Sequence, residues 1–283
     1  MINSNYLFTN NINSKNIKSN SIKILSRKFD KIFLEIKNDI KKSNKILNVL
    51  NKNYKFNFST KDLIKFKKFQ TIVIIGMGGS ILGAEAIYNI FKSKIKKDFH
   101  FFNDLDEEKI KNFKKRNLSK VLFIIISKSG NTIETLSNVF SLNIIKRNSK
   151  NIILVSEKKN NFLFSLSKKL NLFYIEHENY IGGRFSVLSE VGMLPAYLMG
   201  LNIFKLRSKI LNCLKNKNKY FLKNSTIKLA NLMNKRKINS LVFLNYYPEL
   251  EKFLYWAQQL IAESLGKKKK GLLPVISNVP KDH

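Results

Sequence analysis

The chain contains the stretch Val121-Leu122-Phe123-Ile124-Ile125-Ile126-Ser127-Lys128-Ser129-Gly130-Asn131-Thr132. Its unbroken apolar run predicts a strand that is buried on both faces, as in a parallel sheet. The polar loop that follows is expected to open a helix near Thr132. A strand, a polar loop and a helix in succession form the repeating unit of α/β proteins. The sequence therefore predicts an α/β fold with a parallel sheet.

Similar units occur on both sides of this stretch. Further β-branched runs lie at residues 71–75, 151–155, 173–175 and 240–246. Residues 22–50 carry apolar side chains at helical spacing, and the first 20 residues, rich in Asn and Ser, are expected to fray. We therefore predict a helical N-terminal extension over 1–60, a sheet domain over 61–205, and linking helices with the start of a second sheet domain over 206–283.

Composition limits the class of protein. No apolar run of about 18 residues is present, so a membrane span is not expected. Cys213 is the only cysteine, which excludes an intrachain disulfide and favours a reducing compartment. The N-terminal segment lacks the apolar core of a signal peptide, and its first arginine is Arg27, unlike an Arg-rich transit peptide. These features predict a cytoplasmic protein.

The formal net charge of +33 raises the question of a nucleic-acid partner. Lysines are spread along the whole chain among Asn and Ile, as in residues 146–152, and do not form a basic arm. No zinc-knuckle spacing, RNP-like aromatic strand or heptad-linked basic region accompanies the charge. We therefore expect no nucleic-acid partner, and we expect the positive field to favour a small anionic substrate.

A glycine-rich loop, Gly76-Met77-Gly78-Gly79-Ser80, follows the 71–75 run. Glycines let backbone amides approach a ligand, and a helix is expected to begin near Ser80. The dinucleotide fingerprint would need a glycine at Ile81, and the Gly-Lys-Ser/Thr end of a P-loop is missing. Two interpretations stay open for this motif alone, a ligand-binding loop and a tight turn.

The loop after the 121–126 run supplies three hydroxyls, on Ser127, Ser129 and Thr132. Hydroxyl donors, free backbone N–H groups and the positive end of a helix dipole all favour a phosphate dianion. A simpler interpretation is a capped loop, with Thr132 or Asn131 as the N-cap of the next helix.

The third motif is Gly182-Gly183-Arg184. Glycines leave room for a guanidinium to reach into a cleft, where its permanent charge can stabilise a developing oxyanion. The alternative is a surface arginine in a turn.

The fourth motif is a helix that ends at Gly266 and carries Gln259 and Glu263 one turn apart. Trp256 falls on the same side and would partly shield the carboxylate from water, which suits a general base. An ordinary surface helix is the alternative interpretation.

Taken together, these four motifs occur in an order that resembles the glucose-6-phosphate isomerase family, which is built from two sugar-isomerase (SIS) domains of flavodoxin-like form. The resemblance runs from about residue 71 to the end of the chain. It implies a three-layer α/β sandwich and an aldose–ketose isomerase that interconverts glucose 6-phosphate and fructose 6-phosphate through a cis-enediol. It further implies no metal, no redox cofactor and a homodimer in the complete protein.

The resemblance also implies roles for individual residues. Glu263 matches the base that moves a proton between C2 and C1, and Arg184 matches the cation that stabilises the enediolate. The positions that match the phosphate loop are Ser127, Lys128, Ser129 and Thr132, with Lys128 contributing through its backbone. The positions that match the lining of the sugar site are Gly79, Ser80, Gly183 and Gln259.

The chain departs from the family at its C-terminal end, Val279-Pro280-Lys281-Asp282-His283. This end resembles the start of a Pro-Lys-Asp-x-His motif cut at x, so the family's ring-opening histidine would be the next residue, unless a one-residue slip makes it His283. The C-terminal lysine would also lie beyond. His100 and His177 match no catalytic position and are expected to be surface or loop histidines.

Two further interpretations remain. The nearer is another SIS sugar-phosphate isomerase, one that also accepts mannose 6-phosphate. The other is a non-catalytic SIS module that senses a sugar phosphate, although a sensor has no need of a carboxylate base.

Overall fold

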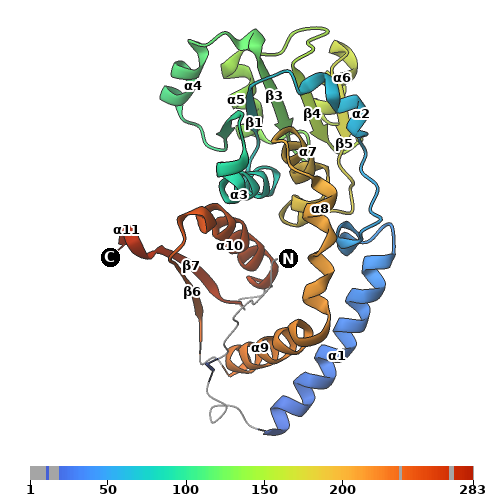
Figure 1. Cartoon of the computed structure of the whole chain (residues 1–283), viewed down its shortest axis with the longest axis vertical. Helices are drawn as coiled ribbons and strands as arrows, with labels where there is room; N and C mark the ends of the chain where they lie inside the picture. Colours follow the sequence, from blue (N-terminus) through green and yellow to red (C-terminus); the bar gives the residue numbers. More distant parts are fainter. Residues whose placement is uncertain (1–10, 13–18, 236–237, 268–270, 283) are drawn as a thin grey trace.

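The computed structural model describes residues 11–12, 19–235, 238–267 and 271–282. A five-stranded parallel sheet lies in its upper part as drawn in Figure 1. Its strands lie in the order β2-β1-β3-β4-β5, and each neighbouring pair is parallel. The strand bounds are β1 Thr71–Ile75, β2 Asp98–Phe102, β3 Val121–Ile126, β4 Ile152–Ser156 and β5 Phe173–Glu176. The predicted α/β fold with a parallel sheet is confirmed.

Helices cover both faces of this sheet. Alternate residues of the strands face two separate cores, with Ile72 and Ile124 in one core and Val73 and Ile125 in the other. The first core is covered by α2 Thr60–Leu63, α3 Leu82–Phe91 and α7 Glu190–Leu198. The second is covered by α4 Glu107–Lys114, α5 Ile133–Leu142 and α6 Phe162–Leu170. The three-layer sandwich is therefore confirmed.

The strand order fixes where a ligand can bind. The chain leaves β1 for β2 on one side and then crosses to β3 on the other side, so the strand order reverses between β1 and β3. This 2-1-3-4-5 order is that of flavodoxin-like folds, in which ligands bind outside the carboxyl ends of the strands at the reversal. The glycine-rich loop follows β1 and the hydroxyl-rich loop follows β3. The fold thus brings these two loops together at the expected place.

The N-terminal part is helical. Helix α1 spans Ser19–Lys41, a short 3₁₀ turn η2 spans Ile46–Leu50, and α1 packs against α9, Asn216–Asn234. Helix α8, Ile203–Ser208, precedes α9. Most of the first 20 residues, expected to fray, lie outside the described residues. The division of the chain at residues 60 and 205 remains a prediction.

A second sheet contains two parallel strands, β6 Ser240–Asn245 and β7 Leu273–Asn278, joined through α10 Glu251–Leu265 and followed by α11 Val279–Asp282. Only the first of these strands is predicted from the sequence, and β7 is missing from the prediction. Strand β7 contains Pro274, which argues against a strand because proline cannot donate to a ladder.

Strand β2 is also missing from the prediction. In Asp98–Phe102, a charged residue and His100 alternate with phenylalanines, so no continuous apolar run marks the strand. The alternation has a structural reason, because β2 is the edge strand of the sheet. Its outer positions meet polar side chains: His100 Nε2 lies 2.7 Å from Asp98 Oδ2, and Arg116 donates to the same oxygen at 3.1 Å.

One face of the small second sheet is apolar and exposed. Val242 and Leu244 on β6 are 53% and 59% exposed, and Leu273 on β7 is 66% exposed. These side chains alternate with residues whose face lies toward α10, which packs against β7. An exposed apolar sheet face with free strand edges promotes self-association.

We predict that the 283-residue polypeptide, produced alone, self-associates and lacks isomerase activity. Leu244→Lys should reduce the self-association measured by light scattering, because it places a charge on the apolar face. The matched control is Leu34→Lys, which changes a residue of α1 that is 60% exposed and should leave self-association as it was. A monodisperse, active parent of the same length would contradict this prediction.

Candidate active site

The glycine-rich loop and the turn Gly182-Gly183-Arg184, called the arginine turn below, touch through their backbones. A side chain on Gly79 would overlap the carbonyl carbon of Gly183 and lie 2.6 Å from the backbone nitrogen of Arg184. Ser186 Oγ donates to Gly183 O at 2.6 Å and to Gly79 O at 3.2 Å, which ties the two loops together. Ser80 closes the turn Gly78–Ser80. This contact brings the sequence-predicted Gly79, Ser80, Gly183 and Arg184 into one place.

Helix α10 completes this group from another part of the chain, because it packs against α3. Arg184 Nη1 donates to Glu263 Oε2 at 3.1 Å, and Gln259 Nε2 donates to Glu263 Oε1 at 2.7 Å. The two donors fix the orientation of the carboxylate. The side chain of Glu263 is 48% exposed, so about half of it is shielded from water.

Two contacts of the arginine are not predicted from the sequence. Arg184 Nε donates to Ser264 Oγ at 3.0 Å, and Trp256 Nε1 donates to the backbone oxygen of Arg184 at 3.1 Å. Ser264 follows Glu263 directly, so the motif contained a signal for it. The Trp256 bond depends on how α10 packs and has no signal in the sequence.

The amide oxygen of Gln259 is buried and has no hydrogen-bond partner among the residues that the structure describes. Its Nε2 is occupied by Glu263, so the free acceptor is the other end of the same amide. A buried acceptor without a partner is costly, and a hydroxyl donor of a ligand would satisfy it. This arrangement suits a polyhydroxy ligand.

The three hydroxyls of the loop after β3 converge. Ser127 Oγ and Thr132 Oγ1 are 2.8 Å apart, and Ser129 Oγ lies 3.4 Å from the same Thr132 oxygen. Gly130 makes the turn possible with φ of 67°, a conformation that glycine adopts readily. Thr132 is the N-cap of α5, but its side chain makes no capping bond. The hydroxyls and the start of the helix are thus arranged as an anion would require.

The Lys128 side chain is held at one side of this loop. Its Nζ donates to Asn179 O at 2.9 Å and lies 3.4 Å from Glu157 Oε1, while its backbone oxygen accepts from Glu157 N at 3.0 Å. These contacts occupy the Lys128 ammonium, and the backbone role of Lys128 stays a prediction. The last residue of β3 lies against the glycine-rich loop, since a Cβ on Gly76 would lie 2.9 Å from Ile126 O. The two halves of the site are therefore neighbours at the strand reversal.

The histidines lie in different settings. His177 is in the loop after β5, within the expectation of a surface or loop histidine, but it is buried and only 2% exposed. His100 lies on strand β2. His283 lies outside the described residues. Within the described ranges, no group of three or more His, Cys, Asp and Glu side chains is placed to share a metal ion.

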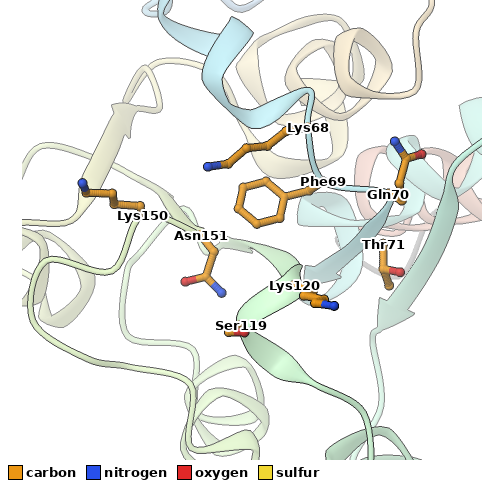
Figure 2. A pocket seen from close by; sticks show the side chains of 8 residues that line it. All are labelled: Lys68, Phe69, Gln70, Thr71, Ser119, Lys120, Lys150 and Asn151. Carbon is orange, nitrogen blue, oxygen red and sulfur yellow. The ribbon is translucent and has the colours of Figure 1, made fainter.

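A separate hollow of about 680 Å³ lies at the other end of the strands (Figure 2). Lys68 and Phe69 line it beside Thr71, the first residue of β1, and Asn151, which precedes β4. It is therefore formed at the amino ends of the strands, away from the loops that carry the four motifs. The candidate active site is the region at the carboxyl ends.

Comparison with solved structures defines the class of the fold. A hypothetical protein from Thermus thermophilus superposes with a TM-score of 0.72 at 23% identity, over 93% of this chain and 67% of that one. A glucose-6-phosphate isomerase from Chlamydia trachomatis superposes with a TM-score of 0.60 at 22% identity, over 76% of this chain and 46% of that one. The fold is that of the SIS phosphosugar isomerases.

Sequence comparison then gives the family. The phosphoglucose isomerase family model matches residues 9–273. A glucose-6-phosphate isomerase of Methanocaldococcus jannaschii is 36% identical over 78% of this chain and 57% of its own length. A probable glucose-6-phosphate isomerase of Methanococcus maripaludis is 36% identical over 95% of this chain and 60% of its own length. The chain belongs to the phosphoglucose isomerase family and spans less than two thirds of the length of these relatives.

No helix within the described ranges combines the length and apolar character that a membrane span requires.

The contact between Gly79 and Gly183 predicts an asymmetric response to a methyl group. Gly79→Ala should displace the arginine turn, destabilise the fold by about 1–3 kcal/mol and lower turnover of the complete protein by about a hundredfold. Gly183→Ala is the matched control for stability, because a Cβ there would meet only Gly79 Cα at 3.9 Å. Thermal midpoints of both variants test the packing, and steady-state rates test the effect of Gly79→Ala on turnover. Equal losses of thermal stability in the two variants would contradict the proposed packing.

The buried His177 predicts a pH effect on stability. Burial, and then the charge of Lys128, lower the pKa of His177 to about 4. The unfolded chain, with a pKa near 6.5, therefore binds a proton first as the pH falls, and stability is lost between about pH 6.5 and pH 4 by up to about 1.4 kcal/mol per pH unit. His177→Phe should remove this loss in urea unfolding at about pH 7 and about pH 5, and His100→Asn should not. A His177→Phe variant as sensitive to pH as its parent would contradict the assignment.

Proposed function

We propose that this protein is a glucose-6-phosphate isomerase, in which Glu263 moves the proton and Arg184 stabilises the enediolate. The contact that carries the proposal is the Arg184–Glu263 pair, whose Nη1–Oε2 distance is 3.1 Å. A base and a fixed positive charge that meet at one point are what proton abstraction beside a carbonyl requires. Family membership gives the reaction class, and the named relatives are themselves glucose-6-phosphate isomerases.

The geometry supports a division of roles. The hydroxyls of Ser127, Ser129 and Thr132, with the backbone of Lys128, would hold the phosphate at the start of α5. Gly79, Ser80 and Gly183 would line the sugar, and the unpaired oxygen of Gln259 would accept a sugar hydroxyl. The sugar carbons would then lie between the loop after β3 and α10, where the carboxylate can reach them.

In the proposed reaction the ring of glucose 6-phosphate opens first. Glu263 then removes the C2 proton, and electrons shift toward the C1 carbonyl oxygen to give a cis-enediolate. The guanidinium of Arg184 favours that charge more strongly than it favours the neutral substrate, which is the condition for lowering a barrier. The hydroxyl proton of O2 then passes to O1, and return of the proton from Glu263 to C1 as the C2 carbonyl forms completes the ketose, fructose 6-phosphate.

We further propose that the complete protein is a cytoplasmic homodimer. The ring-opening histidine and the C-terminal lysine of the family have no counterpart among the described residues of this chain. The alternative is an SIS isomerase that also accepts mannose 6-phosphate. Comparing the turnover of fructose, mannose and arabinose phosphates distinguishes it from an enzyme specific for glucose 6-phosphate.

Replacing the base tests the proposal. Glu263→Gln in the full-length protein should lower kcat at least about a hundredfold, because general-base catalysis contributes about 10²–10⁴. Binding of glucitol 6-phosphate, which has no carbonyl to isomerise, should stay within about threefold. The control Glu249→Gln removes a carboxylate just before the same helix and should have no effect. A Glu263→Gln variant within about tenfold of the parent, or about 1.4 kcal/mol of barrier, would show that Glu263 is not the base.

A further inference from the structure

A buried carboxylate lies behind the arginine turn. Glu190 is the first residue of α7 and is fully buried. Tyr54 Oη donates to both of its carboxylate oxygens at 3.1 Å, and the backbone nitrogen of Asn57 donates to Oε1 at 2.9 Å. Tyr54 and Asn57 lie in the segment 49–57, which runs from the end of η2 toward α2. The N-terminal part of the chain is thus bonded to the start of α7, six positions after Arg184.

Arg207 of α8 holds the same segment from the other side. It is 6% exposed, and its Nη2 donates to Val49 O at 2.7 Å and to Asn51 O at 2.8 Å. Its guanidinium carbon lies 4.9 Å from the ring centres of both Tyr54 and Phe56. A buried polar group that loses its hydrogen bonds is costly, so the bonds of Arg207 and Glu190 favour one arrangement of residues 49–57.

This arrangement bears directly on the turn. Val49 and Tyr54 pack against Ile181, which precedes Gly182-Gly183-Arg184. On the opposite side, the turn rests on Gly79 with no space for a side chain. The turn is therefore enclosed between the glycine-rich loop and residues 49–57. A shift of either neighbour would move the backbone that carries Arg184.

We infer that residues 49–57 form a strap, and that Tyr54 and Glu190 are positioning residues that hold Arg184 where it meets the reacting oxygen. The inference rests on the proposed isomerase function for its kinetic consequence, and on the contacts alone for its structural one. Neither residue contacts Arg184, Glu263 or the hydroxyl loop through a hydrogen bond. Their effect should therefore fall on the chemical step more than on phosphate binding.

The ionisation of Tyr54 supports this role. Burial, and then the negative charge of Glu190, raise the pKa of Tyr54. The hydroxyl therefore stays protonated and keeps donating to Glu190. Tyr180 offers a matched control: its ring packs in the same cluster, and its hydroxyl makes no hydrogen bond with Glu190.

Trp256 is the only tryptophan in the sequence and donates its indole N–H to the backbone oxygen of Arg184. Its indole signal in a ¹H–¹⁵N spectrum, assigned by Trp256→Phe, reports the position of the turn without any need for catalysis. The strap can therefore be tested separately from the isomerase reaction.

The experiment compares Tyr54→Phe and Tyr180→Phe in the full-length protein. Tyr54→Phe should shift the Trp256 indole signal and lower kcat about tenfold, while KM for fructose 6-phosphate and affinity for inorganic phosphate stay within about threefold. Tyr180→Phe should leave all of these unchanged. Glu190→Gln should resemble Tyr54→Phe, and the double variant should lose no more than either single one, because the two residues act through one contact.

The outcomes are distinct. A folded Tyr54→Phe variant with an unmoved indole signal would overturn the strap, and so would Tyr54→Phe and Tyr180→Phe variants that are equally impaired. Should Tyr54→Phe not fold, Glu190→Gln with an unmoved indole signal would overturn it as well. A shifted indole signal in a protein whose parent isomerises no sugar phosphate would support the strap and contradict the proposed function.

Discussion

The close approach of Gly79 and Gly183 is the constraint on which the candidate site depends. Two loops that are more than a hundred residues apart meet backbone to backbone, and a side chain on Gly79 would separate them. This contact fixes the position of the Arg184 backbone relative to the glycine-rich loop. Helix α10 then meets the arginine through Trp256, Glu263 and Ser264. Without the glycine contact, neither the guanidinium nor its partners would have a defined place.

The topology of the sheet explains why the anion loop lies beside this contact. Strands β1 and β3 are neighbours, yet the chain visits β2 between them, so their carboxyl ends leave a crevice at the strand reversal. The glycine loop and the hydroxyl loop both open into it. The helix dipole of α5 and the strong positive charge of the chain favour the same kind of ligand, an anion.

Sequence patterns predict the parts of this fold that depend on local chemistry. The apolar runs of β1, β3, β4 and β5 identify buried strands because both faces of a parallel sheet are covered. Strand β2 is not predicted because it is an edge strand that contains Asp98 and His100, and β7 is not predicted because it contains Pro274. The four motifs lead to the family, which the comparisons confirm.

What the sequence does not reveal depends on packing between distant residues. Tyr54 and Glu190 are 136 positions apart, and nothing in either local pattern indicates that they meet. The burial of His177 and the half exposure of Glu263 follow from neighbouring elements in the same way. Helix α1, Ser19–Lys41, agrees with the helical periodicity of this part of the chain, but the contact of residues 49–57 with Ile181, which precedes the arginine turn, emerges only from the fold.

Solvent isotope incorporation tests the central claim most directly. Full-length protein is incubated with fructose 6-phosphate in D₂O, and the products are followed by NMR. Proton transfer through an enediol predicts glucose 6-phosphate that carries deuterium at C2, because a carboxylate base exchanges its proton with solvent. Unchanged fructose 6-phosphate, or glucose 6-phosphate formed without any deuterium at C2 after many turnovers, would contradict the account.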